Sequence, residues 1–361
     1  MRKIKNAITI TIISLLSFTL SGCWDNKDIN HRSMPVVLGI SKENEEYKVF
    51  LQIPQPSQNS IKTEVVIETA NTVNDAVDKI SANLESDVDL HHVKVIMIEE
   101  ELAQEGLNDL ISGFMRSTDV PPRTIVAICS DDFDQFFSRM KQYQAPEGTA
   151  GTALLDYFEK DAGWTPHIAL TRVWQVYRSI HSYTKDVAIP ILRIGETTLV
   201  EQVGSAVIEN GKMVEQIDSD ETLLFNAFNN HSTQGKIDVM NHGSVSIIGS
   251  TMKHESKFKN EIPYLKSELK LKVTVLETRG NPSAEALKRE LEMQLKTRFD
   301  EMFTKLQTNK ADILGIGQFF RTKIPRKELK DWRSKYYPKL SLDFQVHVDI
   351  QNSGDLKLRS N

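Results

Sequence analysis

The chain has 361 residues, of which 40% are hydrophobic and 26% are charged, a balance that is typical of globular proteins and excludes a disordered, collagen-like or polytopic membrane chain. Its length suggests two or three domains, and its two cysteines exclude a disulfide framework and a four-cysteine zinc site. The net charge of −5 is distributed unevenly along the chain: residues 23–252 hold 18 Lys and Arg against 34 Asp and Glu, whereas residues 253–339 hold 21 against 12. The acidic character of the larger part argues against nucleic-acid binding.

The N-terminal segment has the features of a bacterial lipoprotein signal. Three Lys and Arg residues within the first five positions precede an apolar run over residues 7–20, which is shorter than the ~20 residues that span a bilayer as a helix. The run ends in Leu20-Ser21-Gly22-Cys23, which resembles the lipobox that a signal peptidase cleaves. We therefore expect residues 1–22 to be removed and Cys23 to carry diacylglycerol and an N-acyl group. The alternative is a plain signal peptide, or an anchor helix, with a chance cysteine.

This anchor predicts where the mature chain is held. Two or more acyl chains bind a membrane far better than one, so we expect a tether to the outer leaflet of the cytoplasmic membrane. Trp24 and Asp25 follow the anchor directly, which makes them candidates for contact with headgroups or with a partner. The other thiol, Cys129, ends the apolar run Ile125–Ile128 and is expected to be a buried small hydrophobe.

Residues 23–195 are predicted to form an N-terminal domain of helices and strands. Apolar runs and alternation predict strands over residues 35–54 (two strands), 62–68, 92–98, 124–128 and 187–194. A helical spacing of apolar residues predicts helices over residues 72–84, 102–115, 130–141 and 151–183. Because helices and strands alternate, we expect some parallel strand pairing with crossover helices.

A small middle α+β domain is predicted over residues 196–261. Asn210-Gly211 between two apolar runs indicates a β-hairpin, because these residues accept the positive φ angles of a type I′ turn. A short helix over residues 219–230, which Asp218 and Glu221 can cap, and a strand over residues 244–251 complete this unit.

Residues 262–361 are predicted to form a C-terminal α+β domain. A long helix over residues 282–308 lies between strands at 265–277 and 340–350. Its apolar stripe is Leu287, Leu291, Leu295, Phe299, Phe303 and Leu306, and two i,i+4 ion pairs are expected on its exposed side, Glu292 with Lys296 and Glu301 with Lys305. The predicted fold class is thus α+β, with three mixed domains in which a sheet packs against helices.

No catalytic or metal-ligating constellation is found in the sequence. His91 and His92 would point to opposite faces of a strand, so they do not chelate one ion together. Gly315-Ile316-Gly317 is not completed to a phosphate-binding motif, and a tight turn before the next helix is the better interpretation. We therefore expect no enzymatic activity, no cofactor and no bound metal.

The segment 321–339 is basic and carries interleaved aromatic residues. Candidate contact residues within it are Arg326, Lys327, Lys330, Trp332 and Arg333. In an exported and tethered chain, anionic lipid headgroups or an acidic partner would suit this segment better than nucleic acid. The alternative is a solvated amphipathic helix whose aromatic residues pack on the C-terminal core.

Four stretches together carry a resemblance to the Ger(x)C family, the lipoprotein C subunits of spore germinant receptors in endospore-forming Firmicutes. The stretches are Cys23–Ile29 with Leu38–Ile40 and Gln52–Pro54; His92–Ile96 with Leu102–Leu107 and Met115-Arg116; Val203–Val207 with Asn210–Lys212; and Ala311–Gly317 with Trp332 and the last strand. Their order and spacing are specific, and they cover nearly the whole mature chain, with residues 130–190 matching weakly.

The resemblance implies a three-domain lipoprotein on the outer surface of the spore inner membrane. Its partners would be a polytopic A subunit and a transporter-like B subunit, and its role would be assembly and signalling in a receptor for nutrient germinants. A solute-binding lipoprotein of an importer is the alternative function, but it would need two similar lobes around a cleft. A tethered cell-wall hydrolase would need an acidic pair or metal ligands.

Overall fold

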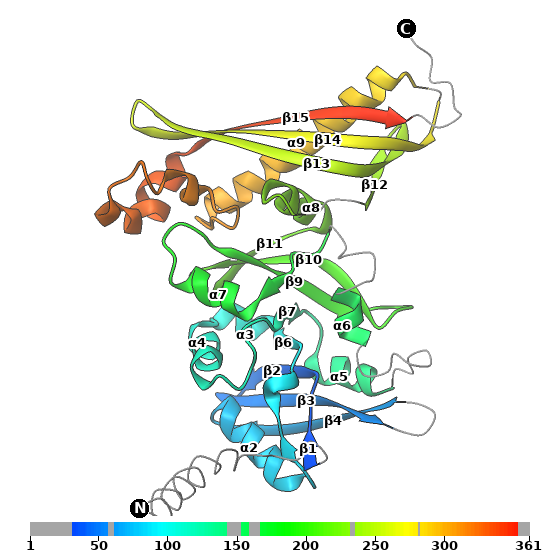
Figure 1. Cartoon of the computed structure of the whole chain (residues 1–361), viewed down its shortest axis with the longest axis vertical. Helices are drawn as coiled ribbons and strands as arrows, with labels where there is room; N and C mark the ends of the chain where they lie inside the picture. The colour runs from blue at the N-terminus through cyan, green and yellow to red at the C-terminus, as the bar shows by residue number, and fades with distance from the viewer. Residues whose placement is uncertain are drawn as a thin grey trace, which may run out of the picture.

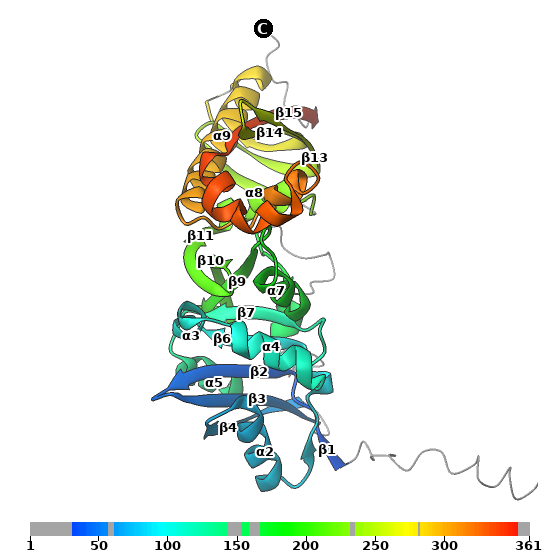
Figure 2. The same cartoon turned by 90° about the vertical axis from the view of Figure 1, so that its left-hand side faces the viewer.

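The computed structural model describes residues 31–56, 61–142, 153–158, 167–231, 235–280 and 282–352, which are called the described residues below. The molecule is elongated, with its first strands at one end of the long axis and its C-terminal sheet at the other (Figures 1 and 2). Sheets with helices packed against them follow one another along this axis, which confirms the mixed α and β composition of the predicted fold class.

A nine-stranded sheet forms the lower part of the molecule. In space its strands run β11-β10-β9-β7-β6-β2-β3-β4, with β8 paired to β7. The neighbours β2/β6, β6/β7 and β7/β9 are parallel, as the alternation of helices and strands predicts, and the remaining pairs are antiparallel. The strands are β2 Val37–Glu43, β3 Glu46–Pro56, β4 Ile61–Ala70, β6 Val95–Glu99, β7 Ile125–Cys129, β8 Thr171–Arg172, β9 Val187–Ile194, β10 Val200–Glu209 and β11 Lys212–Ile217.

Helices cover both faces of this sheet. Its strands are apolar on both sides, so that Leu38 and Ile40 belong to one buried cluster while Val37 belongs to another. The first cluster lies under α2 Val73–Asn83, α3 Glu100–Glu105, α4 Asn108–Ser117 and α7 Val173–Ile180, and the second under α5 Phe133–Gln142 and α6 Ala153–Phe158. Burial on both faces explains why these strands read as continuous apolar runs in the sequence.

The C-terminal sheet has the order β12-β13-β14-β15. Its strands are β12 Gly235–Met240, β13 Gly243–Lys259, β14 Ile262–Thr278 and β15 Ser341–Asn352. The long helix α9 Ala284–Thr308 connects β14 to β15, which pair in parallel, and Ser283 caps its first turn by accepting the N–H of Ala286. The helix between two strands is confirmed, and its predicted stripe is buried apart from Phe303, which is partly exposed.

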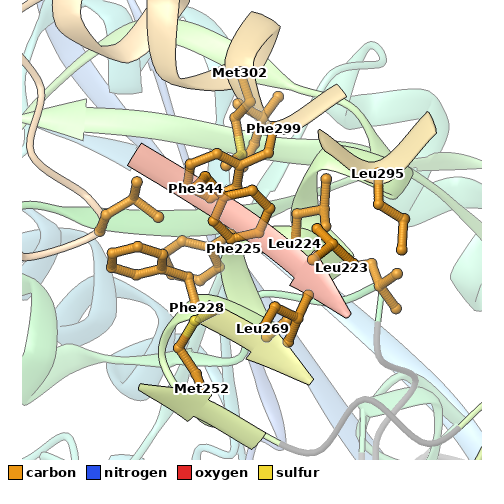
Figure 3. Close-up of a cluster of buried hydrophobic side chains, with 14 of the residues drawn as sticks. Leu223, Leu224, Phe225, Phe228, Met252, Leu269, Leu295, Phe299, Met302 and Phe344 are labelled. Atoms are coloured by element: carbon orange, nitrogen blue, oxygen red, sulfur yellow. The ribbon is translucent and has the colours of Figure 1, made fainter. Parts of the chain in front are cut away.

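Helix α8 Ser219–Phe228 joins the two large sheets into one core. The predicted capping box is present: the Asp218 carboxylate accepts the N–H of Glu221, and the Glu221 carboxylate accepts the N–H of Asp218. Every residue from Glu221 to Phe228 is buried, as expected for a helix enclosed on all sides. Figure 3 shows Phe228 close to the Phe299 and Phe344 rings, whose centroids lie 3.7 Å apart.

The sheets do not end at the predicted domain boundaries of 195/196 and 261/262. The Asn-Gly hairpin forms as predicted, but β10 also pairs with β9, so the hairpin belongs to the nine-stranded sheet. Likewise β13 and β14 pair along their length across the second boundary. The sequence of a turn predicts that its two strands form a hairpin. It does not predict which further strand the hairpin pairs with, because tertiary contacts determine that neighbour.

Several predicted elements are corrected by the structure. The predicted helix 102–115 is broken at Gly106, whose φ of 140° is not helical, into α3 and α4. The predicted helix 151–183 is reduced to α6 and α7 among the described residues, because Thr171 and Arg172 pair with β7 as a strand. The strand β12 was not predicted. The two ion pairs expected on the long helix do not form: Lys296 binds Asp300 and Lys305 binds Glu221 instead.

His91 and His92 were expected on a strand and lie in a helical turn, Leu90–His92. The Asp89 carboxylate starts this turn by accepting the N–H of His91 at 3.0 Å, next to the short parallel pair of β1 Arg32–Ser33 and β5 Asp87–Val88. Burial of Asp89 opposes its ionisation, but hydrogen bonds from His91 and Arg32 outweigh it and lower its pKa to about 2.

Candidate functional site

The predicted contact residues differ in their exposure in the structure. Cys23, Trp24 and Asp25 lie outside the described residues. In the basic segment, Arg326, Lys327 and Lys330 are exposed, but Trp332 is fully buried and the Arg333 side chain is only 15% exposed. Trp332 and Arg333 are therefore not surface contacts, and the alternative of aromatic residues packed on the C-terminal core is correct for Trp332.

Asp312 is the centre of the arrangement that holds these two side chains. Its carboxylate is buried and accepts three N–H groups: the backbone of Ile316 at 2.8 Å, the backbone of Gly317 at 2.7 Å and the indole of Trp332 at 2.9 Å. Burial raises the pKa of Asp312 to about 7, although these donors stabilise the charged form.

Asp186 supplies the second carboxylate of the arrangement, just before β9. Its side chain is 0% exposed, and the Arg333 guanidinium binds both of its oxygens, at 2.6 Å through Nη2 and at 3.1 Å through Nε. The backbones of Asp186 and Asp312 are also joined, because the N–H of Asp186 donates to the carbonyl oxygen of Asp312 at 2.9 Å. In return, the N–H of Asp312 donates to the Asp186 carboxylate at 2.8 Å. We call Asp186, Asp312, Trp332 and Arg333 the buried junction.

Glycine allows the close approach of chains at the buried junction. Gly315 has a φ of 66° and starts the helical turn Ile316–Phe320, which confirms the tight turn that the sequence predicts. A Cβ atom on Gly317 would lie 2.8 Å from both Thr184 and Trp332, so a larger residue would separate the two sheets here. Beside it, Gln318 donates from Nε2 to the carbonyl oxygen of Thr184 at 3.1 Å.

Three of the four stretches that carry the family resemblance meet around this junction. The N–H of Asn210, in the hairpin, donates to the Asp186 carboxylate at 3.4 Å, and Glu209 lies 3.6 Å from Arg333. The carbonyl oxygen of the next residue, Gly211, accepts the N–H of Leu107 at 2.7 Å. The bonds of Asn210 and Leu107 fix the hairpin within the nine-stranded part, and the approach of Glu209 to Arg333 connects it to the C-terminal part.

The chemistry of this arrangement is that of a structural joint. Its charged and polar groups bind one another, and burial leaves them no access to a substrate. Among the described residues, no group of three or more His, Cys, Asp or Glu is placed to hold a metal ion. Cys129 is buried, as predicted, and burial raises its pKa to about 12, so the thiol stays protonated at neutral pH.

Sequence reasoning missed Asp186 and the role of Asp312. The available signal was a single carboxylate beside a continuous apolar run, in Asp186-Val187-Ala188-Ile189 and in Ala311-Asp312-Ile313-Leu314. Such a carboxylate is expected to be buried with its strand or turn, and a buried carboxylate requires a partner. The identity of the partner could not be read from spacing, because Asp186 and Arg333 are 147 residues apart.

Within the part of the chain that the structure describes, no helix has the length and apolar character needed to cross a bilayer.

Comparisons with known proteins give a consistent result along the whole chain. Residues 25–194 match the family described as "Spore germination protein N-terminal domain", and residues 203–354 match "Spore germination B3/ GerAC like, C-terminal". Spore germination protein KC of Bacillus subtilis (strain 168) is 21% identical over 98% of this chain and 96% of its own length. Spore germination protein A3 of the same organism is 22% identical over 96% and 98%. The crystal structure of the GerBC protein matches with a TM-score of 0.58 and 16% identity over 87% of this chain and 97% of that chain, which shows a shared fold.

Proposed function

The chain belongs to the GerAC family of spore germination proteins, and from this premise we propose that it is a non-catalytic, membrane-tethered subunit of a spore nutrient germinant receptor. It acts through contacts with other proteins in receptor assembly and signalling. Its partners are a polytopic A subunit and a transporter-like B subunit. An acyl group on Cys23 holds it at the outer leaflet of the spore inner membrane.

The buried junction is the observation that carries the non-catalytic part of this proposal. Within the stretch Ala311–Gly317 that the family resemblance singles out, Asp312 bonds to Asp186 and Gly317 packs against Thr184, so that this stretch joins the two sheets, and Trp332 binds Asp312 beside it. A catalytic site would instead present such groups in an open pocket with access to substrate. Residues used to fix the relative position of two sheets suit a protein that presents surfaces to partners.

The placement of the ends supports a tether that holds the molecule at its base. The first described strand, β1, lies at one end of the long axis, and the C-terminal sheet lies at the other (Figures 1 and 2). With an anchor at Cys23, the basic residues Arg326, Lys327 and Lys330 would be held away from the membrane. A protein partner therefore fits these residues better than a lipid surface does.

Affinity purification tests this proposal. The tagged, acylated chain is recovered from detergent-solubilised spore membranes, and the proteins that accompany it are identified by mass spectrometry. We expect two polytopic proteins, one of them transporter-like. Recovery of an ATP-driven importer together with a bound small molecule would contradict the proposal and favour the solute-binding alternative.

The variant Cys23→Ala tests the tether separately. We expect it to abolish acylation, measured by metabolic labelling with an alkyne fatty acid, and to release the chain from the membrane fraction, because a protein without acyl chains lacks the anchor. Cys129→Ala is the matched control and should leave labelling unchanged. Persistent labelling and membrane retention of Cys23→Ala would show that another segment anchors the chain.

A further inference from the structure

A hollow of about 650 Å³ lies beside the buried junction, between α7 and the turns that follow α9. The charged and aromatic side chains that line it are Arg178, Lys185 and Arg321, with Tyr177, His181 and Tyr183. Among the described residues that line it there is no carboxylate. We call this site the cationic hollow. Figure 1 shows α7 and the turns on the same side of the molecule, one above the other.

The three cations of this hollow form no salt bridge within the described residues. Lys185 and Arg321 form no ion pair within the described residues, and Arg321 only donates to the Gln318 side-chain oxygen at 3.2 Å. Arg178 stacks on the Trp174 ring, 5.1 Å from its centroid. By contrast, the neighbouring Arg333 is fully engaged with Asp186. The buried Asp312 carboxylate acts on Lys185 from behind, but no carboxylate is among the described residues that line the hollow, so positive charge is in excess there.

The environment of Lys185 favours the arrival of an anion. Its side chain is partly buried and lies over Gly315, at which a Cβ would be 3.0 Å from the lysine Cδ. Burial, and after it the positive charge of Arg178, lower the pKa of Lys185 against the opposing effect of the Asp312 carboxylate. A carboxylate placed in the hollow would remove this repulsion and would be attracted in a partly desolvated site.

The dimensions and composition of the surface indicate a peptide segment rather than a small ligand. Tyr183 is 58% exposed at the rim, which offers an aromatic surface for an apolar side chain. Beyond Arg321 the same segment presents Arg326 and Lys327, both exposed, whereas the Lys323 ammonium donates to Ser256. Cations that continue along the segment outside the hollow complement a chain with more than one carboxylate.

We propose that the cationic hollow binds an acidic peptide segment of a partner protein, with one carboxylate between Lys185 and Arg321 and an apolar side chain against Tyr183. This inference rests on the proposed function, because it names the chemistry by which a receptor partner is recognised.

The experiment compares two hollow variants with a matched control in the purification from spore membranes. Arg321→Glu reverses an exposed charge at the hollow, Lys185→Gln removes the inner one, and Lys272→Glu reverses an exposed charge on β14 away from the hollow. We expect each hollow variant to recover at least about tenfold less partner than the wild type, and the control to recover it normally, since unpaired or like charges at an interface are strongly unfavourable. Circular dichroism identifies any variant that fails to fold. In that case the recovery of partner by the other, folded hollow variant tests the inference.

The outcomes separate this inference from the proposed function. If the wild type recovers no polytopic partner, the proposed function fails. If it recovers them and both folded hollow variants recover them equally, the hollow inference fails while the function stands.

Three further assays test other occupants. Short synthetic peptides tiled over the soluble loops of the recovered partners should bind the wild type, and the acidic ones should lose binding in Arg321→Glu. If instead the variants lose flotation with phosphatidylglycerol vesicles, self-association in sedimentation, or thermal stabilisation by free glutamate, the occupant is a lipid, a second copy or a small carboxylate. Each of these results would overturn the peptide assignment.

Discussion

Replacing Arg333 by Met should weaken the chain strongly, because the replacement leaves the Asp186 carboxylate buried without its cation. The carboxylate is 0% exposed and receives two charge-assisted hydrogen bonds from Arg333, at 2.6 and 3.1 Å. Removing one partner of a buried ion pair costs about 3–5 kcal/mol. We expect a loss of this size in the free energy of unfolding, measured by urea titration. Hydrogen exchange should locate the earliest opening at residues 311–340, where the two sheets meet.

Arg193→Met is the matched control for this prediction. Arg193 also binds a carboxylate at short distance, Glu201 at 3.0 Å, but both side chains are nearly half exposed. Exposed pairs contribute about 0–1 kcal/mol, so the control should change stability little. Combining Arg333→Met with Asp186→Asn should cost at least about 1 kcal/mol less than the sum of the single variants, because the stranded charge is gone. Equal losses for Arg333→Met and Arg193→Met would refute the assignment of a buried junction.

Three further predictions follow from burial and packing, each measured by urea unfolding. Because burial raises the pKa of Asp312 to about 7, the folded chain keeps a proton that the unfolded chain loses near pH 4. Stability should therefore fall as the pH rises between these values, and Asp312→Asn should flatten this slope; an unchanged slope would contradict it. Gly317→Ala should lower stability by about 1–3 kcal/mol through overpacking. Its counterpart Gly113→Ala, in α4 with open space around it, should raise stability by up to about 1 kcal/mol. Stability changes of the same sign in the two variants would argue against the close contact of Gly317 with Thr184 and Trp332. Phe299→Ala should cost about 3–5 kcal/mol, since its ring is fully buried, and a loss below about 1 kcal/mol would count against the stacked core.

Local patterns predicted those elements whose buried face is continuous in the sequence. The stripe from Leu287 to Phe299 recurs every four residues, and the structure buries it against β15 and α8. The ion pairs expected on the same helix failed because Lys305 and Glu292 have tertiary partners, while Lys296 takes another i,i+4 partner, Asp300. Lys305 reaches the buried Glu221 at 2.7 Å, and Glu292 accepts the N–H of Val348 at 2.8 Å. Exposed i,i+4 pairs contribute only a few tenths of a kcal/mol, so such partners override them easily.

The candidate site was predictable in part only. The stretch Ala311–Gly317 and Trp332 were recognised from the family resemblance, and the glycine turn was interpreted correctly. Arg333, however, was expected to contact lipid or a partner because it lies in a basic run. A run of charge does not show which member turns inward, since that choice depends on a carboxylate 147 residues away. Asp186 itself has no local signature beyond its place before an apolar strand.

The buried junction and the cationic hollow share the loop over residues 182–185. The carbonyl oxygen of Ser182 accepts Nη2 of Arg333 at 2.8 Å, and Thr184 accepts Gln318, so the joining of the two sheets helps to hold this loop in place. The hollow takes one wall from this loop and another from Arg321 beyond the junction. A segment bound there would contact both sides and would bind the joined form better than a separated one. By linkage it would stabilise the junction by the same free energy, so that under the proposed function the presence of the partner is registered in the relative position of the two sheets.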